Sequence, residues 1–288
     1  MTEGLRALRE GRGIVDLSSW RSVAVRGTDA ATWLNDLLTA ELEGVSAGEA
    51  RRSLLLSPTG RIRADVAVTP FEDGFLLVQD AVQPSPIDAL LGPYVLSSDV
   101  SIEDRSEELR LYAAPGHARL PEGLSPYRPG PLGMDLGVVV PAEGPGIDPE
   151  ELGLVPATET DLDHYRVERG IPRVGVDLGE DSLPHEAGLD EAIAYGKGCF
   201  LGQEAVAKVR NLGHPPFVVV AVTSPGPVAA GDPVLADGAD VGRVTSAVRT
   251  NGGGAALVRV RWTAREAALS TSDGSALERS AAQTSAGA

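Results

Sequence analysis

Short apolar runs interrupted by turn-forming residues are the feature of this sequence that most restricts its fold. The chain has 288 residues, of which 34 are glycine and 21 are proline. No apolar run reaches the roughly 18 residues that a membrane-spanning helix requires. Strand-like and helix-like segments follow one another without a regular strand–helix repeat, which predicts an α+β fold with mixed sheets.

The N-terminal part reads as strands around one amphipathic helix. Gly27-Thr28-Asp29 supplies a turn and a helix cap, and the next segment places Trp33, Leu34, Leu37 and Leu38 on one face. Turn residues at 57–60 and 72–74 predict hairpins. The strands expected here are 14–17, 22–26, 53–56, 62–68, 75–78 and 100–103.

The C-terminal part changes character after Pro215-Pro216. Before it, a helix is expected over 160–169, ended by Gly170. After it, short strands separated by Gly, Pro and Asp predict a small β-barrel. From Ser270 onward apolar anchors are few, which predicts a disordered tail. The expected divisions are 1–214, an α+β region, 215–269, the barrel, and 270–288, the tail.

Residues 197–204, Lys-Gly-Cys-Phe-Leu-Gly-Gln-Glu, hold the only cysteine of the chain, and the only two lysines, Lys197 and Lys208, flank it. The pattern predicts a helix over 203–210 that starts just after Cys199. A thiol ahead of a helix and beside a cation is expected to be more acidic than its free value of ~8.5. This makes Cys199 the candidate catalytic residue. The alternative is a cysteine that serves as a small buried hydrophobe.

Composition excludes several classes of function. A net charge of −16 argues against sequence-independent binding of nucleic acid. One cysteine provides neither a disulfide framework nor a self-contained zinc site, so no metal ligands are assigned. The glycines at 196, 198 and 202 do not have dinucleotide-loop spacing. Residues 1–12 carry charges and no signal-peptide core, so a cytoplasmic protein without membrane contact is expected.

Six motifs in order resemble the aminomethyltransferase superfamily, and the resemblance spans about residues 14 to 262. The last-but-one motif, K-G-C-x-x-G-Q-E, is similar to that of the folate-binding iron–sulfur maintenance proteins of the YgfZ type, rather than to the glycine-cleavage T-protein. The motifs lie at 17–30, 33–40, 58–66, 166–172, 197–204 and 242–246.

The resemblance implies a three-part folate-binding fold, with two interleaved α+β subdomains around a channel for tetrahydrofolate and a C-terminal barrel. It places Glu168 on the carboxylate that binds the pterin, which suits a group able to accept paired N–H donors. It places Trp20 on a folate-contacting aromatic ring. Asp65 and Lys197 complete the predicted cofactor-binding set. The alternatives are a helix-surface charge for Glu168 and a core or rim position for Trp20.

One departure from the family pattern bears on chemistry. Transferases of the superfamily carry an Asp-Asp pair where this chain has Ala64-Asp65. The missing carboxylate argues against aminomethyl transfer, since proton handling needs a placed acid or base. Asp65 is interpreted as a polar contact or an ordinary strand-end aspartate. Nearby arginines, 51, 52, 61 and 63, are either contacts for the folate glutamate tail or a solvated face.

Three functions follow as hypotheses. The first is a tetrahydrofolate-binding accessory protein for iron–sulfur cluster assembly or repair, acting through Cys199. Since clusters take ~4 cysteine ligands, Cys199 would have to share a cluster with a partner, pair across a dimer, or act by redox exchange. The expected partners are iron–sulfur proteins or their assembly machinery. The second is a tetrahydrofolate-dependent aminomethyltransferase or demethylase. The third is a non-catalytic folate-binding scaffold, so enzymatic activity is left open.

Overall fold

The computed structural model describes residues 1–116, 125–133 and 136–280. The chain forms two compact units, which do not follow the predicted division at residue 214. The chain crosses between them at residues 58–62, within the helix around residue 162, near residue 191, and after residue 203. Unit 1 comprises 1–58, 62–162 and 192–203, and unit 2 comprises 59–61, 163–191 and 204–288.

The first sheet of unit 1 is antiparallel and five-stranded, in the order β3-β4-β5-β2-β6. All five of its strands lie at segments expected from sequence, and the hairpin turns at 57–60 and 72–74 join β3 to β4 and β4 to β5. The sheet therefore forms largely from neighbouring segments of chain. Its strands are β2 (Arg21–Arg26), β3 (Arg51–Leu56), β4 (Ile62–Phe71), β5 (Gly74–Gln79) and β6 (Ser101–Asp104).

Helix α2 (Ala30–Leu37) packs its apolar face on this sheet. Trp33, Leu34 and Leu37 are buried, as their spacing predicts. Because side chains alternate along a strand, the even-numbered residues of β4 between 64 and 68 share the core with α2. Short helices α3 (Ile87–Leu91) and η1 (Gly92–Tyr94) follow β5.

The second sheet of unit 1 has the order β10-β1-β7-β9-β8, and its β1–β10 pair alone is parallel. Helix α1 (Glu3–Arg9), which the sequence analysis did not predict, is capped by the Thr2 hydroxyl. Ile14, Tyr112, Val138 and Leu154 form the buried core beside this sheet. The remaining elements are β1 (Gly13–Asp16), β7 (Leu109–Ala113), β8 (Ser125–Tyr127), η2 (Pro131–Gly133), β9 (Gly137–Pro141) and β10 (Val155–Ala157).

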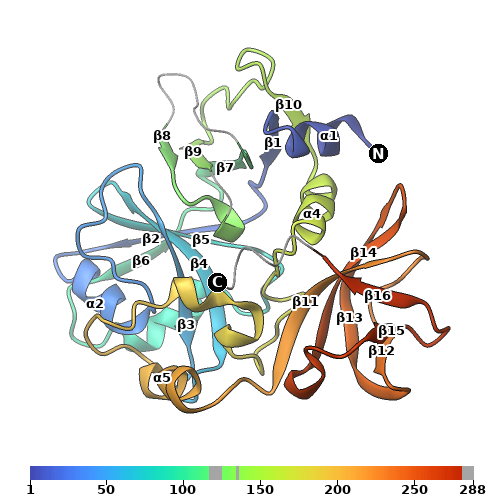
Figure 1. Cartoon of the computed structure of the whole chain (residues 1–288). Coiled ribbons are helices and arrows are strands. Elements are labelled where there is room, and N and C mark those ends of the chain that lie inside the picture. Colours follow the sequence, from blue (N-terminus) through green and yellow to red (C-terminus); the bar gives the residue numbers. More distant parts are fainter. Residues whose placement is uncertain (117–124, 134–135, 281–288) are drawn as a thin grey trace. The chain divides into compact units, whose positions relative to one another are not determined.

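Unit 2 contains a closed six-stranded barrel in the order β11-β14-β13-β12-β15-β16, drawn from orange to red in Figure 1. The barrel confirms the predicted C-terminal β-barrel. Its apolar interior holds Val222, Val244 and Val258 among others. The strands are β11 (Phe217–Ser224), β12 (Pro233–Ala236), β13 (Ala239–Thr250), β14 (Gly253–Arg261), β15 (Leu269–Ser270) and β16 (Ala276–Arg279).

The tail predicted from residue 270 is wrong for the part of it that the structure describes. Strand β16 pairs with β11 and β15 and closes the barrel. Leu277 is 4% exposed and belongs to the barrel core, so one apolar side chain fixes a segment that is otherwise polar. Residues 281–288 of the predicted tail lie outside the described residues.

Two longer helices belong partly to unit 2. Helix α5 includes Asn211, so it extends beyond the predicted end at residue 210. No helix in the described part of the chain is long and apolar enough to cross a membrane. The remaining elements are α4 (Glu159–Glu168), η3 (Pro184–Ala187), η4 (Leu189–Ala192), α5 (Gln203–Leu212) and η5 (Trp262–Ala264).

Leu277→Ala is expected to lower the free energy of unfolding by about 2–5 kcal/mol, because it removes buried apolar atoms and leaves a cavity in the barrel. Urea denaturation of the purified chain measures the change. The control is Glu278→Ala, an exposed position on the same strand, which should change stability far less. Equal stability of Leu277→Ala, Glu278→Ala and the wild type would instead support the prediction that this segment is disordered.

Candidate functional site

The predicted site residues are divided between the two units. Trp20, Asp65, Lys197 and Cys199 lie in unit 1, and Glu168 lies in unit 2. Each group is therefore described within its own unit.

Residues 192–203, here called the cysteine loop, are hydrogen-bonded to the end of α2 and the residues after it. The Thr39 hydroxyl donates to the carbonyl of Ala192 at 2.6 Å, and the Ala194 N–H donates to the carbonyl of Thr39 at 2.9 Å. The Leu201 N–H donates to the carbonyl of Asp36 at 3.2 Å. Cys199 lies between these attachment points and is exposed.

Lys197 sends its ammonium group into the C-terminal end of α2. Its Nζ donates to the carbonyl oxygens of Asn35 at 2.6 Å, Leu38 at 2.6 Å and Ala40 at 2.7 Å. An ammonium has three N–H groups, so these acceptors account for all of them. The sequence predicted that Lys197 binds the cofactor. In the structure its N–H groups instead donate to backbone carbonyls of the same chain.

The surroundings of Lys197 are partly apolar. Its Nζ lies 5.3 Å from the ring centroid of Phe200, a cation–π distance, and Phe200 is buried. Burial lowers the pKa of Lys197 to about 8, while the carboxylates of Glu41 and Asp36 act in the opposite direction. The side chains of Lys197 and Phe200 thus point inward, whereas Cys199 between them is exposed.

Asp65 forms a bidentate ion pair with Arg52. Arg52 Nε donates to Oδ1 at 3.0 Å and Nη2 donates to Oδ2 at 2.6 Å. Burial alone would lower the pKa of Arg52, but the Asp65 carboxylate raises it above its ordinary value. The Gln83 side chain accepts from the Asp65 N–H at 2.9 Å and donates to the Asp65 carbonyl at 2.8 Å. Asp65 is therefore fixed through both its side chain and its backbone.

Ala64, where the family pattern has a second aspartate, faces the opposite side of β4. It is completely buried in the core shared with α2, near Val66 and Leu55. A carboxylate at this position would have to lie among apolar side chains. The missing aspartate is thus consistent with the packing of this chain.

Trp20 immediately precedes β2 and is 4% exposed. Its backbone N–H donates to the carbonyl of Leu17 at 2.8 Å. The side chain of Trp20 is therefore largely buried within the described structure.

Glu168 is the last residue of α4 and its side chain is 17% exposed. His164, one turn earlier, places Nε2 3.2 Å from Oε1 of Glu168. The sequence analysis did not include His164 in the site. The i,i+4 spacing of a histidine and a glutamate on a predicted helix is the signal that would have found it.

Arg166 anchors the helix that carries Glu168 to the barrel. It is 1% exposed and donates to Asp177 Oδ2 at 2.7 Å, to Ser246 Oγ at 2.8 Å and to Asp163 Oδ1 at 2.7 Å. The Ser246 hydroxyl also donates to Asp177 Oδ1 at 2.7 Å, which completes the network. Because the buried charge of Arg166 is fully hydrogen-bonded, it favours a single arrangement of α4, Asp177 and strand β13. The sequence motifs at 166–172 and 242–246 therefore contact one another in unit 2.

The arginines proposed for a folate tail have partners of their own. Besides the Arg52–Asp65 pair, Arg61 donates to the carbonyl of Asp181 at 2.5 Å and lies 3.8 Å from Glu186. Arg51 lies 3.6 Å from Glu49. These contacts give the arginines structural roles within their own units.

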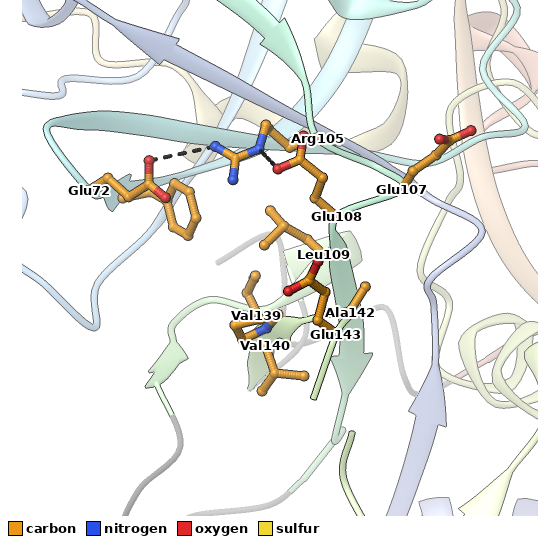
Figure 2. A pocket seen from close by; sticks show the side chains of 11 residues that line it. Glu72, Arg105, Glu107, Glu108, Leu109, Val139, Val140, Ala142 and Glu143 are labelled. Atoms are coloured by element: carbon orange, nitrogen blue, oxygen red, sulfur yellow. Dashed lines mark hydrogen bonds and ion pairs between the residues drawn. The ribbon is translucent and has the colours of Figure 1, made fainter. Parts of the chain in front are cut away.

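A cavity of about 510 Å³ in unit 1 lies apart from the predicted residues, none of which line it. Figure 2 shows Arg105 at its rim, directed toward Glu72 and Glu108, with Val139 and Val140 along another wall. Arg105 donates to Glu108 at 2.7 Å and lies 3.6 Å from Glu72, so its charge is already compensated. The cavity has an acidic rim and provides no uncompensated cation for the carboxylates of a folate.

Among the residues that the structure describes, no three His, Cys, Asp or Glu side chains come together as a metal site. Cys199 would therefore need ligands from another molecule to hold a metal centre.

The comparisons with known proteins point to one group. Residues 1–116 match the family model described as the GCVT N-terminal domain. The chain is 28% identical over 280 residues to an aminomethyltransferase of Streptomyces avermitilis, covering 83% of this chain and 75% of that protein. It is 29% identical over 275 residues to an aminomethyltransferase of Rubrobacter xylanophilus, covering 83% and 73%.

The structural comparison agrees. The glycine cleavage system aminomethyltransferase T of Bartonella henselae superposes with a TM-score of 0.79 at 22% identity, covering 96% of this chain and 88% of that one. The chain thus has the fold of that aminomethyltransferase, with a closed C-terminal barrel, and it is similar in sequence to aminomethyltransferases over most of its length.

Proposed function

We propose that this protein binds tetrahydrofolate or a related folate and acts through Cys199 as an accessory protein in iron–sulfur cluster assembly or repair. The observation that carries the proposal is the exposed thiol on a loop hydrogen-bonded at several points to the end of α2 and the residues just after it. A buried cysteine would have been a packing residue. An exposed one on a fixed backbone can meet a partner in a defined orientation.

Folate binding is supported by the fold and by the setting of Glu168. The carboxylate lies on a helix that Arg166 fixes to the barrel, and it retains partial exposure. A fixed carboxylate can accept the two adjacent N–H groups of a 2-amino-4-oxopterin. In this proposal Glu168 orients the ligand through its carboxylate.

The thiolate would serve as one ligand of a cluster whose other ligands come from the partner protein. A cluster takes ~4 thiolate ligands, and the chain has a single cysteine. Because the cluster is the cargo, the chain needs to hold it only through one bond. Client proteins would be iron–sulfur enzymes or their assembly machinery.

Aminomethyl transfer is the second candidate, favoured by the relatives that carry this name. Two observations weigh against it. Position 64 is a core alanine, and both oxygens of Asp65 accept hydrogen bonds from Arg52. A carboxylate paired in this way is a poor proton carrier, and general acid–base catalysis depends on proton transfer at the reacting group. A folate-binding scaffold without chemistry is the third candidate.

Glu168→Gln is expected to weaken tetrahydrofolate binding about tenfold or more, because loss of a charge-assisted hydrogen bond costs roughly 1.5–3 kcal/mol. Anaerobic titration followed by tryptophan fluorescence measures the affinity. Glu159→Gln, at the exposed start of the same helix, should bind as the wild type does. Equal affinity in Glu168→Gln and Glu159→Gln would remove Glu168 from the ligand site.

Cys199→Ala is expected to abolish the recovery of iron–sulfur enzyme activity in cells that depend on this protein, while tetrahydrofolate affinity stays unchanged. Cys199→Ser, similar in size but a poorer metal ligand, should fail in the same way. Full recovery with either variant would exclude a thiol-based role. If both variants fail yet still form a complex with the client enzyme, the result separates cluster handling from scaffolding.

Ala64→Asp tests the transferase alternative. Restoring the carboxylate is expected to destabilise the fold by about 3–5 kcal/mol, as an uncompensated buried charge does, rather than to create transfer activity. Urea denaturation and turnover of an aminomethyl donor with tetrahydrofolate are measured together. Ala239→Asp, at an exposed position, is the stability control. A stable Ala64→Asp protein that turns over the aminomethyl donor would favour the transferase alternative.

A further inference from the structure

Helix α2 ends in carbonyl groups that cannot be satisfied within the helix. The last carbonyls of any α-helix lack i+4 donors and carry the negative end of the helix dipole. In this chain the partner is the Lys197 ammonium, which accepts no hydrogen bond and can donate three. It meets the carbonyls of Asn35, Leu38 and Ala40 at 2.6–2.7 Å.

The segment that carries the thiol is intrinsically free to move. Gly196 and Gly198 flank Lys197, and a Cβ placed on either would meet no atom within 4 Å. Packing does not require glycine there, so these residues add backbone freedom without a steric need. The order of the segment must come from its attachments, which include the Lys197 ammonium before Cys199, the Leu201 N–H after it, and the Gln203 amide that donates to the Gly198 carbonyl at 3.4 Å.

We propose that Lys197 is a positioning residue, which fixes the cysteine loop to the end of α2 and so presents the Cys199 thiol by geometry rather than by electrostatic activation. All three N–H groups of Nζ are taken up by backbone oxygens, and its charge is directed into the helix end. The importance of this positioning for function rests on the proposed role of Cys199, whereas the positioning itself can be measured without any ligand.

The single cysteine makes the test unambiguous, because alkylation by iodoacetamide reports Cys199 alone. Lys197→Met removes the donors and keeps the side-chain length, and Lys208→Met, at the only other lysine and exposed, is the matched control. In Lys197→Met, hydrogen exchange of the amides in 194–201 is expected to accelerate at least tenfold. The pH dependence of the alkylation rate should keep the shape it has in the wild type.

Lys197→Arg distinguishes a specific fit from a general charge effect. A planar guanidinium cannot direct three N–H groups to convergent carbonyls as an ammonium does, so this variant should also show accelerated exchange. Unchanged exchange in both Lys197 variants would overturn the proposal. An alkylation profile displaced to higher pH in Lys197→Met, but not in Lys208→Met, would also overturn it in favour of electrostatic activation.

Failure of the proposed function gives a different pattern. If Cys199→Ala restores iron–sulfur enzyme activity in cells while exchange in Lys197→Met is still accelerated, the accessory role is wrong and the positioning stands. If exchange is unchanged and Cys199→Ala is inactive, the accessory role stands and the positioning is wrong.

Discussion

Three short contacts between one ammonium and the end of one helix determine how unit 1 presents its thiol. Lys197 satisfies carbonyls of α2 and the residues just after it, while α2 itself is held by the apolar face that packs on the first sheet. The position of Cys199 is therefore tied to a hydrophobic core through a polar contact. The burial of Trp33 and Leu34 stabilises α2 on the sheet, and it therefore also stabilises the position of the exposed Cys199 side chain.

A comparable division of labour holds in unit 2. The guanidinium of Arg166 is buried with Asp177 and Ser246, and the carboxylate two residues later keeps its exposure. Along this short helix the inner charge, Arg166, holds the structure, and the outer charge, Glu168, is the one proposed to bind the folate. Both candidate groups, a thiol and a carboxylate, therefore lie on segments held by hydrogen-bonded cations, the half-buried Lys197 and the buried Arg166.

The sequence predicted elements whose signals are local. The apolar spacing in α2 and the turn residues at 57–60 each specify their own structure within a few residues. By contrast, β16 was missed because its single anchor, Leu277, gains its burial from strands distant in sequence. The acceptors of Lys197 were equally hidden, since they are backbone carbonyls 157–162 residues earlier, and a carbonyl has no identity in a sequence. The Arg52–Asp65 pair lay within a predicted hairpin, yet adjacent arginines gave no indication of which one faces the aspartate.

Strand β16, only Ala276–Arg279, closes the barrel, so the loss of this short segment would affect the whole barrel. Strand β16 covers β11 along one side and β15 along the other. A proteolytic nick before residue 276 would open this seam and leave unpaired edges on both neighbours. Unpaired strand edges recruit other chains, so loss of a few residues would favour intermolecular aggregation over simple fraying.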